Sequence, residues 1–145
     1  MANPRYWREN PSRYNLMGMR CENCMTVYFP PRAICPKCRR KSVGKMKSYR
    51  LSGKGKVYSY TVVHDPMPDF TLIKPYIMAM IEMEEGVRLT AQIVDCEPEQ
   101  VSIGMQVEAT LRKLGEEGRS GIIRYGYKFR PIRQNGTAHT EAAKK

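Results

Sequence analysis

The chain has 145 residues, of which 41% are hydrophobic and 27% are charged, and its formal net charge is +11. This length allows one medium-sized domain or two small ones. The charge suits a nucleic acid, an anionic cofactor or an acidic protein as partner, and its sign does not choose among them. The longest apolar run, Tyr76 to Ile81, is too short to span a bilayer, and no apolar signal segment opens the chain. We therefore expect a cytoplasmic protein without a membrane partner.

Residues 1–15 are expected to form an N-terminal helical segment. Pro4 stands where a helix can begin, and Pro11 is expected to break or restart it. Large aromatic side chains in a segment with little core of its own are typical anchors of protein interfaces. The candidate partner-binding residues are therefore the three aromatic residues of this segment: Tyr6, Trp7 and Tyr14.

Four of the five cysteines lie in the stretch CENCMTVYFPPRAICPKC, as two Cys-x-x-Cys pairs separated by ten residues. A secreted disulfide scaffold spreads its cysteines along the chain, and a thioredoxin-type site needs only one such pair. Two pairs that aim their sulfurs at one point supply the tetrahedral thiolate set that zinc prefers, whereas iron fits the same ligands and is less favoured. The predicted metal ligands are Cys21, Cys24, Cys35 and Cys38.

The predicted metal site is structural. All four coordination positions are filled by protein sulfurs, so neither water nor substrate can reach the metal. Residues 16–48 form the zinc ribbon and a basic linker, and a segment this short depends on metal for its stability.

The pattern becomes strand-like in residues 49–133. Alternating apolar and polar residues predict five strands with short connections and one longer loop that contains prolines. This arrangement is typical of a small antiparallel barrel, of which the five-stranded OB-fold is the commonest example. The final residues, 134–145, lack apolar periodicity and are predicted to be a disordered tail. The expected strands cover 57–63, 76–83, 87–94, 106–114 and 122–129.

The last expected strand alternates basic and aromatic residues, which resembles a stacking platform for nucleic acid. Successive side chains of a strand point to opposite faces, so Tyr125, Tyr127 and Phe129 share one face with Ile123. An aromatic row in line with an aliphatic residue favours a place in the core. The basic residues then occupy the other face, where they can still bind an anion.

No catalytic residues are predicted. His64 and Asp65 are adjacent, so their side chains diverge on a strand, and no nucleophile is placed to meet them. Cys96 follows a strand and is expected to be a buried, inert thiol.

The order of these features resembles a known family. Four segments carry the resemblance: YWRENPSRY near the N-terminus, FPPR between the cysteine pairs, LSGKGKVYSYTVV at the start of the barrel and YKFRPI at its end. The chain resembles the acyl-CoA-associated family, which is defined by a domain of unknown function. The resemblance implies an N-terminal helix, a rubredoxin-like zinc ribbon and a C-terminal OB-fold. Met25 stands where many ribbons have a glycine, which predicts strain in that turn.

The resemblance also implies a function. It is closest to the archaeal accessory subunits that bridge acetoacetyl-CoA thiolase and 3-hydroxy-3-methylglutaryl-CoA synthase in the mevalonate pathway. It therefore implies a non-catalytic scaffold in a hetero-oligomer with these two enzymes, with coenzyme A as a candidate ligand near the interface. The alternative is a module that binds single-stranded nucleic acid, which is less favoured. A direct carrier or sensor of acyl-CoA is a third, weaker hypothesis.

Overall fold

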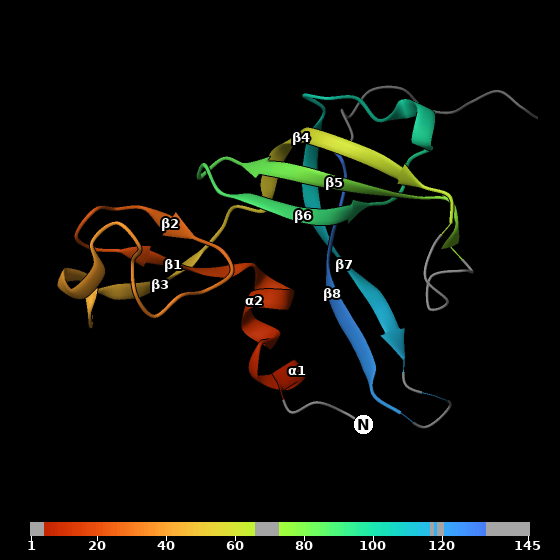
Figure 1. The fold of residues 1–145 in the computed structure, drawn as a ribbon. Helices are drawn as coiled ribbons and strands as arrows, with labels where there is room; N and C mark the ends of the chain where they lie inside the picture. The colour runs from red at the N-terminus through yellow and green to blue at the C-terminus, as the bar shows by residue number, and fades with distance from the viewer. Residues whose placement is uncertain (1–4, 66–72, 117, 119–120, 133–145) are drawn as a thin grey trace, which may run out of the picture.

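The computed structural model describes residues 5–65, 73–116, 118 and 121–132, and it is mainly β (Figure 1). The predicted tail, 134–145, lies outside the described residues, as does the loop 66–72. The elements in chain order are α1 (Arg5–Arg8), α2 (Asn10–Asn15), β1 (Met17–Cys21), β2 (Val27–Tyr28), η1 (Arg39–Ser42), β3 (Met46–Arg50), β4 (Lys54–Val63), β5 (Tyr76–Met83), β6 (Arg88–Ile93), η3 (Pro98–Gln100), β7 (Gln106–Glu116) and β8 (Ile123–Pro131).

Two short helices form the N-terminal segment, in agreement with the sequence prediction. Pro11 lies in the first turn of α2, where its missing N–H costs no helical hydrogen bond, so it restarts the helix after α1. The helix ends at Leu16, which adopts a left-handed conformation with φ 50° and is buried. In Figure 1, α2 lies between the ribbon and the barrel, and it contacts both β1 and β8.

The ribbon is a three-stranded antiparallel sheet in the order β2-β1-β3. Gly18 of β1 permits the close approach of β2, because a Cβ at this position would lie 2.5 Å from the carbonyl oxygen of Tyr28. The sheet is small, and its two cysteine-bearing turns extend away from the barrel in Figure 1. This arrangement places the metal ligands at the far end of the ribbon.

Five strands close into a barrel in the order β4-β5-β6-β8-β7, which confirms the predicted OB-fold architecture. The inward-facing residues of the β5–β6 hairpin are all buried, and β6 follows the predicted alternation. β5 has the near-continuous apolar sequence expected of a strand covered on both faces, but its outer face is open, since Met80 is 39% exposed. The core of the barrel also takes one residue from each of β4, β7 and β8: Val57, Val107 and Phe129.

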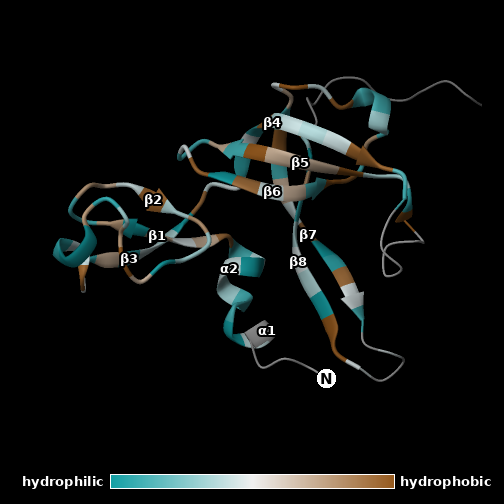
Figure 2. Cartoon of the chain, viewed as in Figure 1, coloured by the Kyte–Doolittle hydropathy of each residue, from teal (hydrophilic) through white to brown (hydrophobic). Residues whose placement is uncertain are grey.

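The outer end of the β7–β8 hairpin differs from the prediction. Phe129 is buried and Tyr127 packs against the core, but Tyr125 is 41% exposed and Ile123 is 46% exposed. The two strands continue past the rest of the barrel, so no neighbouring strand covers their far ends (Figures 1 and 2). The aromatic face is therefore core only near the barrel. Beyond it, Figure 2 shows hydrophobic segments on a projecting hairpin.

The ribbon and the barrel share one hydrophobic core. Leu16 and Leu51, which flank the ribbon strands, belong to the same buried cluster as the barrel residues, and Val27 and Phe29 pack against it. The ring of Phe29 meets that of Tyr127 edge to face, with 5.6 Å between the ring centroids. The predicted boundaries at 15, 48 and 133 thus divide a continuous core, and their independence as folding units stays a prediction. No helix in the described part of the chain is long and apolar enough to cross a membrane.

Candidate functional site

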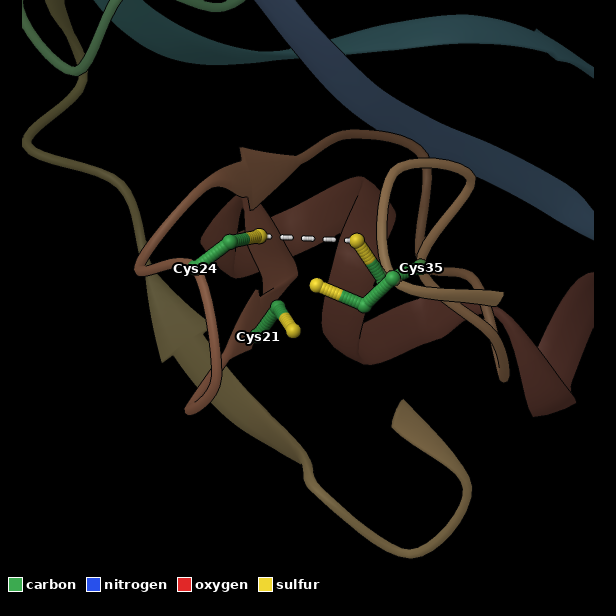
Figure 3. Close-up of side chains that lie close together, drawn as sticks. Cys21, Cys24 and Cys35 are labelled. Carbon is green, nitrogen blue, oxygen red and sulfur yellow. Dashed lines mark hydrogen bonds between the residues drawn. The ribbon is translucent and has the colours of Figure 1, made fainter. Parts of the chain in front are cut away.

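The four predicted ligands converge in the ribbon. The sulfur atoms of Cys21, Cys24, Cys35 and Cys38 all lie within 4.8 Å of one another, and Figure 3 shows the three labelled cysteines pointing their sulfurs toward a common centre. The Cys24 and Cys35 sulfurs are 3.5 Å apart. Zinc bonded tetrahedrally to thiolates at about 2.3 Å separates neighbouring sulfurs by about 3.8 Å, whereas a disulfide needs about 2.05 Å. The arrangement fits a metal ion and not a disulfide.

Both cysteine pairs sit in the same kind of turn. The N–H of Met25 donates to the Cys21 carbonyl, and the N–H of Arg39 donates to the Cys35 carbonyl, each at 2.8 Å. Met25 and Arg39 both have positive φ, at 58° and 49°. The strain expected at Met25 is therefore present, and it recurs in the second turn, since left-handed geometry costs an L-residue about 1–2 kcal/mol.

Side chains outside the ligand set orient the sulfurs. Asn23 donates from Nδ2 to the Cys38 sulfur at 3.1 Å, and the Tyr28 hydroxyl lies 3.2 Å from the Cys35 sulfur. A phenol or amide donor stabilises thiolate charge and fixes the direction of the sulfur lone pairs. These polar neighbours suit a cluster of deprotonated ligands.

Ser42 braces the second turn from within. It is fully buried, accepts a hydrogen bond from the Cys35 N–H at 3.0 Å and donates one to the Arg39 carbonyl at 2.6 Å. The hydroxyl therefore acts as both donor and acceptor inside the turn. Ser42 therefore positions Cys35 without contacting the metal centre, and no sequence pattern signals this role.

The thiols differ in acidity. Hydrogen bonding with the side chain and backbone of Thr26 lowers the pKa of Cys24 to about 6. The Asn23 hydrogen bond lowers the pKa of Cys38, but burial and hydrogen bonds to the other cysteines outweigh it and raise that pKa to about 11. A divalent metal favours the thiolate form of every ligand, so metal binding releases protons.

Soft thiolates in a closed tetrahedral set suit zinc, and the metal would hold the two turns together without an open position for water or substrate. The ribbon's four cysteines are thus positioned for a structural zinc ion.

The structure describes two of the three predicted partner-binding aromatics. Trp7 is 66% exposed, with the Arg8 guanidinium 5.7 Å from its ring centroid, and Tyr14 is 39% exposed. Tyr6 lies in α1, and its side chain is outside the described part of the chain. Tyr14 and Leu111 line a shared hollow of about 220 Å³, so helix and hairpin form one continuous surface.

The polar residues considered for catalysis lie apart from this centre. His64 and Asp65 are exposed at the end of β4. Cys96 is half-buried against the core, and burial raises the pKa of its thiol, with the charges of Asp95 and Glu97 adding to the effect. A raised pKa leaves Cys96 a weak nucleophile.

A groove that the sequence did not predict crosses the outer face of β5, β6 and β8. It has a volume of about 720 Å³, and its walls come from α2 and from Phe29 and Pro30 of the ribbon. Two of the basic residues that alternate with the aromatic residues of β8, Arg124 and Lys128, line it. Its existence depends on how the ribbon packs on the barrel, which local periodicity does not encode.

Fold and metal centre together define a protein that joins a zinc ribbon to an OB-fold. Residues 8–44 match the rubredoxin-like zinc ribbon domain of ChsH2, and residues 48–112 match the C-terminal OB-fold domain of ChsH2. A DUF35 domain-containing scaffold protein of Methanocaldococcus jannaschii is 59% identical over 128 residues, which cover 88% of this chain and 89% of that relative. The chain belongs to the DUF35 family of scaffold proteins.

Two further relatives widen the comparison. A solved structure described as an Ltp2-ChsH2(DUF35) aldolase has a TM-score of 0.68 and 32% identity, covering 90% of this chain and 96% of that chain. The benzoylsuccinyl-CoA thiolase subunit BbsA of Geobacter metallireducens is 28% identical over 117 residues, which cover 81% of this chain and 75% of that relative.

Proposed function

We propose that this protein is a non-catalytic scaffold subunit that bridges an acetoacetyl-CoA thiolase and a 3-hydroxy-3-methylglutaryl-CoA synthase, so that acetoacetyl-CoA passes between them in the mevalonate pathway. The observation that carries the proposal is 59% identity to a relative named as a scaffold protein. A relative named as a thiolase subunit supports a thiolase as one partner. The synthase is proposed from the resemblance of the sequence motifs described above.

The metal centre supports a structural role. A ligand set complete with four cysteines leaves the metal no position for substrate, so it can stabilise a docking surface but cannot act as a Lewis acid. The aldolase and thiolase named among the relatives are assemblies or subunits in which a chain of this family need not carry the chemistry itself.

Two regions of the surface suit two partners. We assign the first enzyme to the helices and ribbon, with Tyr6, Trp7 and Tyr14 as the anchoring aromatics, and the second enzyme to the barrel. Trp7 and Tyr14 are exposed, as anchors must be before a complex forms. Coenzyme A would lie near the junction of the two enzymes in such a hetero-oligomer.

Proximity explains why a pathway would use a scaffold. Claisen condensation of two acetyl-CoA units is unfavourable at equilibrium, so the thiolase step advances only when its product is removed. Holding the synthase beside the thiolase raises the local concentration of that product, as linking two modules does for binding.

Binding of single-stranded nucleic acid is the alternative function, since the charge is +11 and the fold is an OB-fold. OB-folds bind such ligands on the face of their second and third strands, which are β5 and β6 here. Side chains of α2, together with Phe29 and Pro30, wall this face. The rings of Phe29 and Tyr127 on this face meet edge to face, at an interplanar angle of 70°, and do not offer a succession of open ring faces for bases, which favours the scaffold over the nucleic-acid module.

The proposal is tested by mixing the purified protein with the purified thiolase and synthase on a sizing column. We expect all three to elute as one complex at micromolar concentration. Replacing Tyr6 and Trp7 together by alanine should release the enzyme bound to the helices, because a buried aromatic anchor contributes about 2 kcal/mol or more.

A matched pair of variants distinguishes the loss of a specific anchoring side chain from the loss of any exposed aromatic side chain. Tyr14 and Tyr60 are both 39% exposed, but Tyr60 lies on β4 of the barrel. Tyr14→Ala should weaken the helix-bound enzyme and Tyr60→Ala should leave it bound. Separate elution of all three wild-type proteins would refute the scaffold function.

A further inference from the structure

The groove on the outer barrel face continues into a second hollow. The first has a volume of about 720 Å³ and the second about 240 Å³, and both are open to solvent. Phe29 and Pro30 stand between them, since both hollows are lined by these two residues and by Thr90 and Tyr127. The two hollows therefore form one track over β5 and β6, which is more extended than a compact ligand needs.

The floor of the track is apolar. Met78 and Ala91 line the larger hollow, and Met80, which is 39% exposed, lines the smaller one. Met78 and Met80 are alternate residues of β5, so both project from its outer face. Exposed methionines adapt to partners of varied shape, and are frequent at protein-binding surfaces.

The larger hollow is lined by more basic than acidic residues. Three basic residues line it and only one carboxylate does, that of Glu9, which is already 2.8 Å from the Arg13 guanidinium. Lys128 makes no hydrogen bond or ion pair within the described residues. Burial lowers the pKa of Lys128, with a smaller contribution from Arg112, which reflects a cation without a compensating charge. An incoming carboxylate would supply that charge.

We propose that this track receives an extended acidic segment of a partner enzyme, with a carboxylate of the segment paired to Lys128 and an apolar side chain seated over Met80. An extended chain directs alternate side chains to the same side, which suits two hollows in a row. The inference deepens the proposed scaffold function and rests on it, because the segment belongs to one of the bridged enzymes.

The aromatic residues of the track favour a peptide over a nucleic acid. Phe29 and Tyr127 pack edge to face with each other, at an interplanar angle of 70°. Bases stack on open ring faces arranged in succession, and these two rings are not arranged that way.

The test uses fluorescent overlapping peptides that tile the thiolase and the synthase, with binding to the full-length protein followed by anisotropy. We expect binding by a peptide that combines acidic and apolar residues. Lys128→Glu should weaken it by about tenfold or more, because it places like charges together. Thr90→Trp should weaken it similarly by filling the track at an exposed position without altering the basic residues.

The control is Lys45→Glu, which makes the same charge change at an exposed position that lines neither hollow. This variant should bind like the wild type, and all three variants should keep the wild-type melting temperature.

The outcomes distinguish the two proposals. If the three full-length proteins assemble but no peptide binds, or binding survives both track variants, the track inference is wrong and the scaffold function stands. If wild-type protein assembles with neither enzyme, the scaffold function itself fails. Displacement of the peptide by an oligothymidylate, whose own binding is lost in Lys128→Glu, would assign the track to nucleic acid instead.

Discussion

At the scale of single residues, the two cysteine turns carry backbone strain where a glycine would carry none. Met25 and Arg39 have positive φ, and Met25 is 57% exposed, so its side chain contributes little packing. The strain at Met25 is predictable from its place after the first cysteine pair. The strain at Arg39 can be predicted in the same way, because Arg39 follows Cys38 just as Met25 follows Cys24.

We predict that Met25→Gly and Arg39→Gly each stabilise the zinc-loaded ribbon by about 0.5–1 kcal/mol. Relief of about 1–2 kcal/mol of strain outweighs the entropy that glycine loses on folding. The measurement is the free energy of unfolding in denaturant at fixed excess zinc. Gly44→Ala is the reverse control: its φ of 72° should make it destabilising, although a Cβ there meets nothing within 4 Å. Destabilisation by both glycine variants would contradict the account.

The metal centre gives a second prediction at this scale. Cys35 is fully buried and its sulfur contacts those of the cluster, so Cys35→Ser should abolish tight metal binding. Elemental analysis of the wild-type protein should find one zinc per chain. Cys96→Ser, a thiol outside the cluster, should leave the zinc in place. Wild-type protein without tightly bound metal would contradict the assigned ligands.

At the scale of elements, the sequence predicts the buried face of a strand where apolar and polar residues alternate. It does not predict contacts that depend on how distant segments pack together. β6 alternates strictly between polar and apolar residues, so its buried face is evident from the residue pattern alone, whereas β5 is apolar at almost every position and its pattern does not show which face is buried. The aromatic face of β8 is also evident from the residue pattern. How much of that face is buried depends on how far the neighbouring strands extend along it. The placement of Phe29 on Tyr127 joins segments distant in sequence, and no local pattern encodes it.

The shared core yields a prediction about the domains. Residues 49–133 expressed alone should still melt cooperatively, because they hold all five barrel strands. The fragment should be less stable than the intact chain, since it lacks Leu16 and the ring of Phe29. Leu16→Ala in the full chain should cost about 2–4 kcal/mol by leaving a cavity. Calorimetry of the three proteins provides the comparison, and a fragment as stable as the whole chain would show that the ribbon contributes nothing to the barrel.

At the scale of the whole molecule, the charge of +11 suits both functions, and the salt dependence of binding discriminates between them. A protein that neutralises several phosphates loses orders of magnitude in affinity between about 50 and 200 mM salt. We predict only weak, salt-labile binding of single-stranded DNA or RNA, without a defined site size. Filter binding at both salt concentrations measures this, and micromolar binding that persists at the higher salt would favour the nucleic-acid module.

The central claim is that the protein couples two enzymes and has no turnover of its own. The most direct measurement follows the conversion of acetyl-CoA to 3-hydroxy-3-methylglutaryl-CoA by the purified thiolase and synthase, with and without this protein. We predict a higher coupled flux when it is present, while the separate activity of each enzyme changes less. Equal flux in both mixtures would contradict the scaffold function.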